Sequence, residues 1–363
     1  MVALTLPHPT VDAIDAHYAA HQDQRPPQRL TARLLSGCER AGWYAFRWAH
    51  EPKVFAPHHA RANMARAMAM DELGQCLSDI GVTVLRLDPV TYQSRDIVAL
   101  DGHYRQKIAG TAQGILEAPK TEHFLYLDQL PSKAVAQIKK HGLAEARPDR
   151  IAPIQIGMHM LGLTRTFYMV RDKDTDELHS ERIEYDAARA LALLGKGERI
   201  RDASQPPVRV SDDWQYFECR GCPAAHLCHQ SQFALRNCRT CLHATPVPDG
   251  WHCARHDRDL SVNDQAAGCP NHLYLPGLVP GEQIDADERA ETVTYRLADQ
   301  STWTDGAFAP QCEVCDGSGK IAVTRWGFDG DSDRQYPESV DEEPCEECGG
   351  TGRVQSETDG AHP

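Results

Sequence analysis

The chain of 363 residues lacks any hydrophobic run long enough to cross a membrane, which takes about 18 consecutive apolar residues. It also lacks a basic start. The first residues, MVALTLPHPTVDAID, soon turn acidic, unlike the positively charged start of a secretory signal. These two absences predict a cytoplasmic protein that has no membrane partner.

Positive charge is scarce as well. The sequence has 38 Lys and Arg against 52 Asp and Glu, a net charge of −14. Residues 310–363 hold 13 acidic and 4 basic residues, so −9 of the −14 lies there and −5 remains for the other 309 residues. This balance argues against a general nucleic-acid binder, but it does not exclude a locally basic channel in the first domain.

Disulfides are not expected in a reducing compartment, so close cysteine pairs indicate metal ligands instead. Twelve of the 13 cysteines fall into three groups of four. The remaining one, Cys76, lies in a predicted helix, where we expect a buried free thiol that packs as a small apolar residue.

The first group is built on Cys219, Cys222 and Cys228 in YFECRGCPAAHLCHQ, with the spacing C-x2-C-x5-C. Three thiolates supply most of a metal site, but most structural sites need four ligands. We favour Cys38, in SGCERAGWY, as the fourth, with His226 and His229 as the alternatives. If Cys38 closes the site, the metal joins residue 38 to residue 228.

The second group lies within 32 residues rich in turn formers, a pattern typical of a small zinc module. Its predicted ligands are Cys238, Cys241, Cys253 and Cys269. Four histidines could substitute for one of these cysteines: His243, His252, His256 and His272.

The third group comes from two copies of C-x2-C-x-G-x-G, in CEVCDGSGK and CEECGGTGR. Each pair of thiolates sits in a tight turn in which the glycines permit positive φ, and two such knuckles make one tetrahedral zinc site. The predicted ligands are Cys312, Cys315, Cys345 and Cys348, with an acidic hairpin tip between the two copies.

The order of predicted elements favours a mixed α/β first domain. Residues 58–80, rich in Ala, Met and Leu, are the clearest helix, with Met64, Met68 and Met70 expected as core filler. Further helices are predicted over 33–48, 131–141, 149–161 and 186–202. Strands are predicted over 82–87, 97–100, 104–109, 123–127, 164–170 and 178–185.

The predicted domain organisation follows these elements and the cysteine groups. It comprises a lead-in at 1–30, a first domain with a metal centre at 31–232, a zinc module at 233–275, a linker with one short strand at 276–309, a zinc finger at 310–354 and a disordered tail at 355–363.

Two resemblances to known families refine this picture. The tail repeats resemble a half-copy of the cysteine-rich zinc finger of DnaJ-type cochaperones, but no J-domain signature accompanies them. Residues 30–230 resemble the RecB-like branch of the PD-(D/E)XK nucleases, in a form carried by bacteriophages. The segments that carry this second resemblance are GCERAGWYAFRWA, GILEAPKTEHFLYL, LTRTFYMVRDKDTDELHSERIEYD and FECRGCPAAHLCH.

The nuclease resemblance implies a fold and a cofactor. The fold would be a PD-(D/E)XK-like mixed sheet flanked by helices, here followed by two small zinc-binding modules. Several such nucleases place one cysteine near the domain start and three near its end around an iron–sulfur cluster. Cys38, Cys219, Cys222 and Cys228 match that layout, which implies a [4Fe–4S] cluster beside the two zinc ions.

The catalytic positions depart from the family. Such nucleases use an Asp and then a Glu-x-Lys on the next strand to hold a divalent metal. The alignment places Gln113 at the Asp, Tyr126 at the Glu and Asp128 at the Lys. The Gln-x3-Tyr helix motif of this branch falls at Pro153 and Gly157. We therefore assign no catalytic residue.

A displaced site is the alternative, because carboxylates lie nearby. Its candidates are Asp96, Asp101, Glu117, Lys120 and Glu122. Glu117 and Lys120 are three apart, however, which points them to opposite faces of a strand.

The sequence as a whole predicts an inactive, phage-type nuclease relative that serves as a binding platform. Its expected partners are DNA or a protein of a recombination or host-defence complex. The other hypotheses are an active metal-dependent exonuclease and a purely protein-binding regulator.

Overall fold

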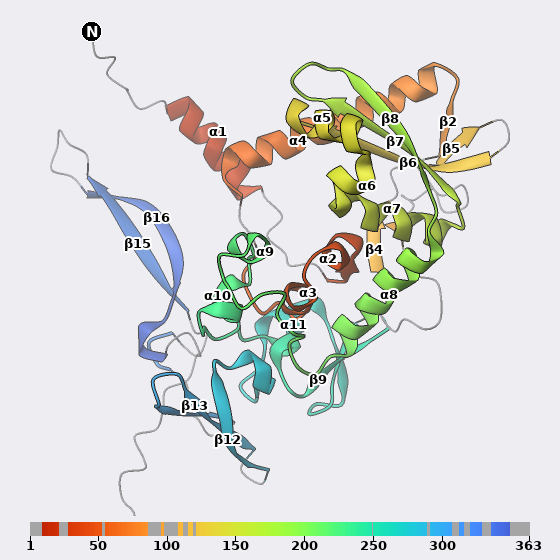
Figure 1. Ribbon diagram of the computed structural model, residues 1–363. Coiled ribbons are helices and arrows are strands. Elements are labelled where there is room, and N and C mark those ends of the chain that lie inside the picture. The colour runs from red at the N-terminus through yellow and green to blue at the C-terminus, as the bar shows by residue number, and fades with distance from the viewer. Residues whose placement is uncertain are drawn as a thin grey trace, which may run out of the picture. The chain divides into compact units, whose positions relative to one another are not determined.

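A computed structural model describes residues 9–21, 28–52, 55–85, 96–97, 108–111, 115–118, 121–248, 250–288, 291–306, 312–315, 320–328 and 335–348. The chain forms two compact units (Figure 1). The first combines residues 1–39 with 52–199, and the second combines residues 40–51 with 200–363. No described helix is long and apolar enough to cross a membrane.

A five-stranded mixed sheet organises the first unit, in the order β2-β5-β6-β7-β8. Its strands are β2 (Thr83–Leu85), β5 (Ile115–Ala118), β6 (Thr121–Leu130), β7 (Arg165–Asp172) and β8 (Leu178–Glu184). β6 and β7 run parallel, whereas the other neighbours are antiparallel. Parallel neighbours need a long crossover, and here the helices α5 (Ser132–His141), α6 (Leu143–Ala146) and α7 (Pro148–Leu161) supply it.

The helix α4 (Pro57–Asp79) covers one face of this sheet. Its Leu73 packs with Leu125, Leu127 and Met169, which alternate with oppositely directed residues along β6 and β7. The opposite face carries Phe124, Asp128, Tyr168 and Val170, all buried. α7 packs against β6 and β7, ends at left-handed Gly162, and also contacts α2 (Ala32–Ser36).

Smaller elements complete the first unit. They are α1 (Pro9–Ala20), α8 (Ala187–Asp202) and a second sheet of β1 (Leu30–Thr31), β4 (Ile108–Thr111) and β3 (Asp96–Ile97). α1 lies along α4, where Arg61 pairs with Asp15 and its guanidinium lies 5.5 Å from the centre of the Tyr18 ring.

The predicted α/β class, with a mixed sheet flanked by helices, is confirmed. The predicted helices over 58–80, 131–141, 149–161 and 186–202 are also confirmed within a few residues. Other expectations were wrong. Cys76, Met64 and Met68 are exposed rather than core residues, because α4 buries only Leu73 and Gly74 among its described residues. The lead-in contains α1, which was not expected.

The second unit has its core where residues 40–51 meet the segment of the second cysteine group. Helix α3 (Glu39–Phe46) brings in Trp43 and Phe46, which are fully buried with Trp251. The Arg47 guanidinium lies 4.9 Å from the Trp43 ring centre, and that of Arg239 lies 3.7 Å from the Trp48 ring centre. Cation–π stacking of this kind offsets part of the cost of burying two cations.

Around this core lie short elements. α9 (Phe217–Arg220) carries Cys219, α10 (Ala225–His229) carries Cys228, and Cys222 lies between the two helices. The segment of the second cysteine group contains η1 (Cys238–Thr240), β9 (Ala244–Val247), β10 (Gly250–Cys253), β11 (Arg258–Leu260) and α11 (Val262–Ala267). β9, β10 and β11 form an antiparallel sheet.

Residues 276–309 hold more structure than the single expected strand. After η2 (Pro276–Leu278), a three-stranded antiparallel sheet forms from β12 (Gly281–Asp287), β13 (Thr292–Leu297) and β14 (Thr302–Gly306). Buried Tyr295 on β13 faces buried Trp303 on β14, with ring centres 5.9 Å apart. The expectation of one strand was therefore wrong, because β12 and β14 are stabilised by pairing with β13 rather than by an apolar pattern of their own.

The tail is a long hairpin of β15 (Lys320–Phe328) and β16 (Gln335–Pro344), followed by η3 (Glu346–Cys348). The acidic hairpin tip was expected over 329–343, but residues 335–343 belong to β16, because they pair with β15, so that the expected tip is too long. Residues 329–334 and the tail at 355–363 lie outside the described residues.

Candidate functional site

Strand β6 carries Tyr126 and Asp128, the two positions that the sequence resemblance aligns with the Glu and the Lys of the nuclease motif. Tyr126 and Asp128 lie two residues apart, so they share one face of the sheet. The preceding strand, β5, pairs with β6, and Gln113 lies just before it, outside the described residues. Pro153 and Gly157 lie on α7, which packs on β6 and β7.

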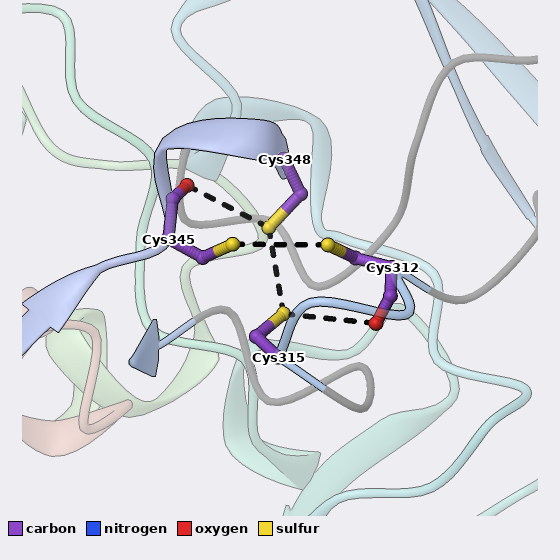
Figure 2. A group of neighbouring side chains, drawn as sticks. All are labelled: Cys312, Cys315, Cys345 and Cys348. Carbon is purple, nitrogen blue, oxygen red and sulfur yellow. Dashed lines mark hydrogen bonds between the residues drawn. The ribbon is translucent and has the colours of Figure 1, made fainter. Parts of the chain in front are cut away.

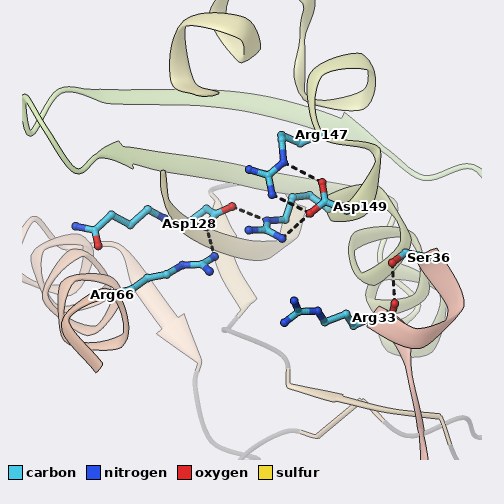
Figure 3. Close-up of polar contacts among 8 residues, drawn as sticks. Arg33, Ser36, Arg66, Asp128, Arg147 and Asp149 are labelled. Atoms are coloured by element: carbon cyan, nitrogen blue, oxygen red, sulfur yellow. Dashed lines mark hydrogen bonds and ion pairs between the residues drawn. The ribbon is translucent and has the colours of Figure 1, made fainter. Parts of the chain in front are cut away.

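Asp128 has no exposed surface and is held by two arginines (Figure 3). Its Oδ1 pairs with Nη2 of Arg66 from α4, and its Oδ2 accepts a 2.7 Å hydrogen bond from Nε of Arg150 on α7. The backbone N–H of Gln129 also donates to Oδ1, at 2.9 Å. Both carboxylate oxygens therefore point at cationic or N–H donors.

A second carboxylate extends the network. Asp149 accepts hydrogen bonds from Nε and Nη2 of Arg147, at 2.9 and 2.8 Å, and from Nη1 of Arg150, at 2.7 Å (Figure 3). Partial burial raises the pKa of Asp149, but the hydrogen bond from Arg147 and the charges of Arg150 and Arg147 outweigh it, so its pKa lies below the ordinary value. Arg150 thus bridges the carboxylates of Asp128 and Asp149.

Two tyrosines lie beside the buried carboxylate. Tyr126 and Tyr168 are register partners on β6 and β7, with stacked rings 6.1 Å apart. Burial, and then the charge of Asp128, raises the pKa of Tyr168, so its hydroxyl stays protonated. Tyr168 is fully buried, and its hydroxyl has no hydrogen-bond partner among the described residues.

These residues do not fit a divalent metal at Asp128. Mg²⁺ is held by carboxylate and other oxygen ligands, whereas the oxygens of Asp128 are already engaged by two guanidinium groups. Tyr126 offers only a neutral phenol, because burial raises its pKa above the ordinary value. A third arginine, Arg147, adds further positive charge to the site.

The alternative, displaced set of residues is only partly described. Asp101 and Lys120 lie outside the described residues, while Asp96 and Glu117 are placed by their backbone alone. Glu122 is exposed on β6, and Glu117 is its cross-strand partner on β5.

A four-cysteine group in the tail has the geometry of a metal site (Figure 2). The sulfurs of Cys312, Cys315, Cys345 and Cys348 are buried and lie within 4.8 Å of one another. Two of the sulfur pairs, 312–345 and 315–348, are each 3.7 Å apart. Tetrahedral zinc with Zn–S bonds of about 2.3 Å requires S–S separations of about 3.8 Å. This group can therefore bind a metal such as zinc.

The second cysteine group lines one cavity of about 120 Å³. Cys238, Cys241 and Cys253 are buried, and Cys269 is half-buried. Burial and the neighbouring thiols raise the pKa of Cys238 to about 12. Burial also raises the pKa of Cys241, to about 11, although backbone N–H groups of Leu273 and His243 donate toward its sulfur and lower it.

Two of the proposed histidine substitutes in this group have other partners. His272 contacts the Thr240 hydroxyl at 3.1 Å, and Nδ1 of His252 lies 3.0 Å from Asp259. His243 and His256 also line the cavity.

The first cysteine group is placed only in part. Cys219, Cys222 and Cys228 follow one another along α9 and α10, with the N–H of Cys222 donating to the carbonyl of Cys219 at 3.0 Å. Cys38 belongs to the other compact unit, so the four-cysteine set stays a prediction. The same holds for His226 and His229 as alternative ligands.

Sequence reasoning missed the arginines around Asp128. A signal was present, because an acidic residue in the middle of a hydrophobic strand needs a nearby cation, and the segment RPDR at 147–150 supplies two. Arg66, 62 residues away on α4, had no comparable signal.

Comparison with known proteins gives a distant likeness. No family model matches the chain, and no curated protein matches it either. The crystal structure of a protein named SSO0001 is 13% identical, with a TM-score of 0.36 over 61% of this chain and 96% of that one. An alkaline exonuclease from Laribacter hongkongensis is 12% identical, with a TM-score of 0.33 over 52% of this chain and 90% of that one. The same exonuclease in complex with dAMP is 13% identical, with a TM-score of 0.34 over 50% and 88%.

Proposed function

We propose that this chain is a nuclease-like protein that binds DNA without cutting it. The observation that carries the proposal is the ion-pair cluster on β6, where buried Asp128 lies between Arg66 and Arg150. In an active relative this position would carry a lysine next to metal-binding carboxylates. In this chain the position carries Asp128, whose carboxylate pairs with two arginines.

The chemical reason is the charge of the site. Hydrolysis of a phosphodiester needs a bound divalent metal that generates hydroxide and stabilises the developing negative charge. The Asp128 carboxylate pairs with two guanidinium groups, those of Arg66 and Arg150. A cation that entered there would also meet the charge of Arg147. The positive charge of the arginines therefore repels a metal ion and attracts an anion.

The proposal also assigns three metal centres. The tail cysteines would hold one zinc, supported by the 3.7 Å sulfur separations. Cys238, Cys241, Cys253 and Cys269 would hold a second zinc, supported by the cavity that they line together. A [4Fe–4S] cluster on Cys38, Cys219, Cys222 and Cys228 is supported by their spacing and by the family resemblance. The two zinc modules would serve as docking surfaces.

The test is a cleavage assay with the full chain. We expect no degradation of linear single- or double-stranded DNA in magnesium or manganese, because Asp128 with its two arginines does not fit a divalent metal. An active nuclease of the same type, assayed in parallel, verifies the conditions.

The opposite result has a defined meaning. If cleavage tracks the protein through purification and disappears in Asp101→Asn, Glu117→Gln or Glu122→Gln, the displaced carboxylates form a working site and the chain is an exonuclease. Absence of both cleavage and DNA binding would leave a protein partner as its ligand.

A further inference from the structure

The cluster around Asp128 carries more positive charge than its carboxylates need. Four arginines come from three elements of the first unit: Arg33 from α2, Arg66 from α4, and Arg147 and Arg150 at the start of α7. Figure 3 shows the Arg33 guanidinium directed toward the Asp128 network. Among the described residues, two carboxylates, Asp128 and Asp149, pair with these four cations, which leaves an excess of two positive charges in that part of the chain.

The carboxylates position three of the arginines. Asp128 uses one oxygen for Arg66 and the other for Arg150, so these two guanidinium groups are held on either side of a buried anchor. Asp149 joins Arg150 to Arg147. Because the guanidinium groups are held in place before a ligand arrives, binding between them costs less conformational entropy.

Many N–H groups of these arginines remain available. A guanidinium has five donors, and Arg66 uses one of them on Asp128. Its Nε is buried and has no hydrogen-bond partner among the described residues, as is also true of the fully buried Tyr168 hydroxyl. Arg33 is exposed, and within the described part of the chain no carboxylate pairs with it. Within the described residues, the cluster therefore has more hydrogen-bond donors than acceptors.

The ligand that fits is a phosphate group. Guanidinium groups match phosphate oxygens in bidentate geometry, and several arginines converging on one point are typical of phosphate recognition. The arginines also lie where an active relative would place metal ions against the DNA backbone. We propose that Arg33, Arg66, Arg147 and Arg150 grip a backbone phosphate of DNA at the position from which the metal site has been lost. This inference rests on the proposed DNA-binding function.

The experiment measures DNA affinity of the full chain against salt concentration. Arg33→Gln with Arg147→Gln removes two cations that do not touch Asp128, so the fold should be retained, which circular dichroism verifies. We expect a loss of about tenfold in affinity and a salt slope lower by about one. Arg182→Gln, an exposed arginine on β8 that pairs with Glu184, is the matched control and should bind as the parent does.

Three other results would each contradict part of the proposal. DNA binding by the parent with equal affinity and slope in the double variant would overturn the phosphate grip and leave the platform function standing. No DNA binding by the parent would overturn both the proposed DNA-binding function and the phosphate contact. If inorganic phosphate then raised the melting temperature of the parent but not of the double variant, the arginines would bind a small phosphate compound, and DNA as the source of the phosphate would be overturned.

Discussion

At the scale of single residues, Asp128 changes the chemistry of the site. A carboxylate with no exposed surface is costly unless it is paired and hydrogen-bonded. Arg66, 62 residues earlier, and Arg150, 22 residues later, supply the pairing. Asp128 is thus the centre of an ion-pair network that joins α4, β6 and α7.

That network should contribute strongly to the stability of the first unit. Asp128→Asn removes the charge and leaves two guanidinium groups facing each other. We expect a loss of about 3 kcal/mol in the free energy of unfolding, at the lower end for a broken buried pair because both arginines reach solvent. Urea unfolding measures it.

Asp149→Asn is the matched control. It breaks pairs with the same Arg150, but its side chain is 44% exposed, so the expected loss is no more than about 1 kcal/mol. Equal losses in the two variants would mean that burial of Asp128 adds nothing.

At the scale of elements, the tail knuckles show how a short motif builds a site. In each knuckle the second sulfur lies near the carbonyl of the first cysteine, at 4.0 Å for Cys315 and 3.8 Å for Cys348. The hairpin of β15 and β16 joins the two knuckles and brings them together. Two local turns and one pairing of strands are enough to place four sulfurs.

This geometry predicts a specific loss of metal. Cys345→Ser removes one thiolate of four, so the chain should lose about one zinc ion when its metal content is measured, because a structural tetrahedral site uses all four ligands. Cys76→Ser, at the exposed cysteine of α4 outside the three groups, is the control and should keep the full content. Unchanged zinc in Cys345→Ser would remove the tail site from the assignment.

At the scale of the whole molecule, the three cysteine groups predict the metal content of the chain. The full chain, purified anaerobically, should be brown and contain about four iron and two zinc ions, because each four-cysteine group is assigned one centre. Cys38→Ala should lose the iron and the colour and keep the zinc. Colourless protein that contains zinc alone would eliminate the iron–sulfur assignment.

Much of the local structure was determined by the sequence itself. The helices over 57–79, 132–141 and 148–161 follow from apolar spacing and from Pro at a helix start, which depend on residues a few positions apart. The knuckle at each end of the tail hairpin follows from its C-x2-C spacing in the same way. These patterns act between residues close in the sequence, so they do not depend on contacts with the rest of the chain.

The tertiary structure decided what no local pattern encodes. It paired Asp128 with Arg66, joined residues 40–51 to residues 200–363, and formed β12 and β14 beside β13 in a segment expected to hold one strand. It also left Met64 and Met68 exposed on α4. For the ion pair, the joined segments and the added strands, the stabilising partner lies outside the segment itself. Ion pairs, strand pairing and burial depend on distances in space, which the order of residues along the chain does not reveal.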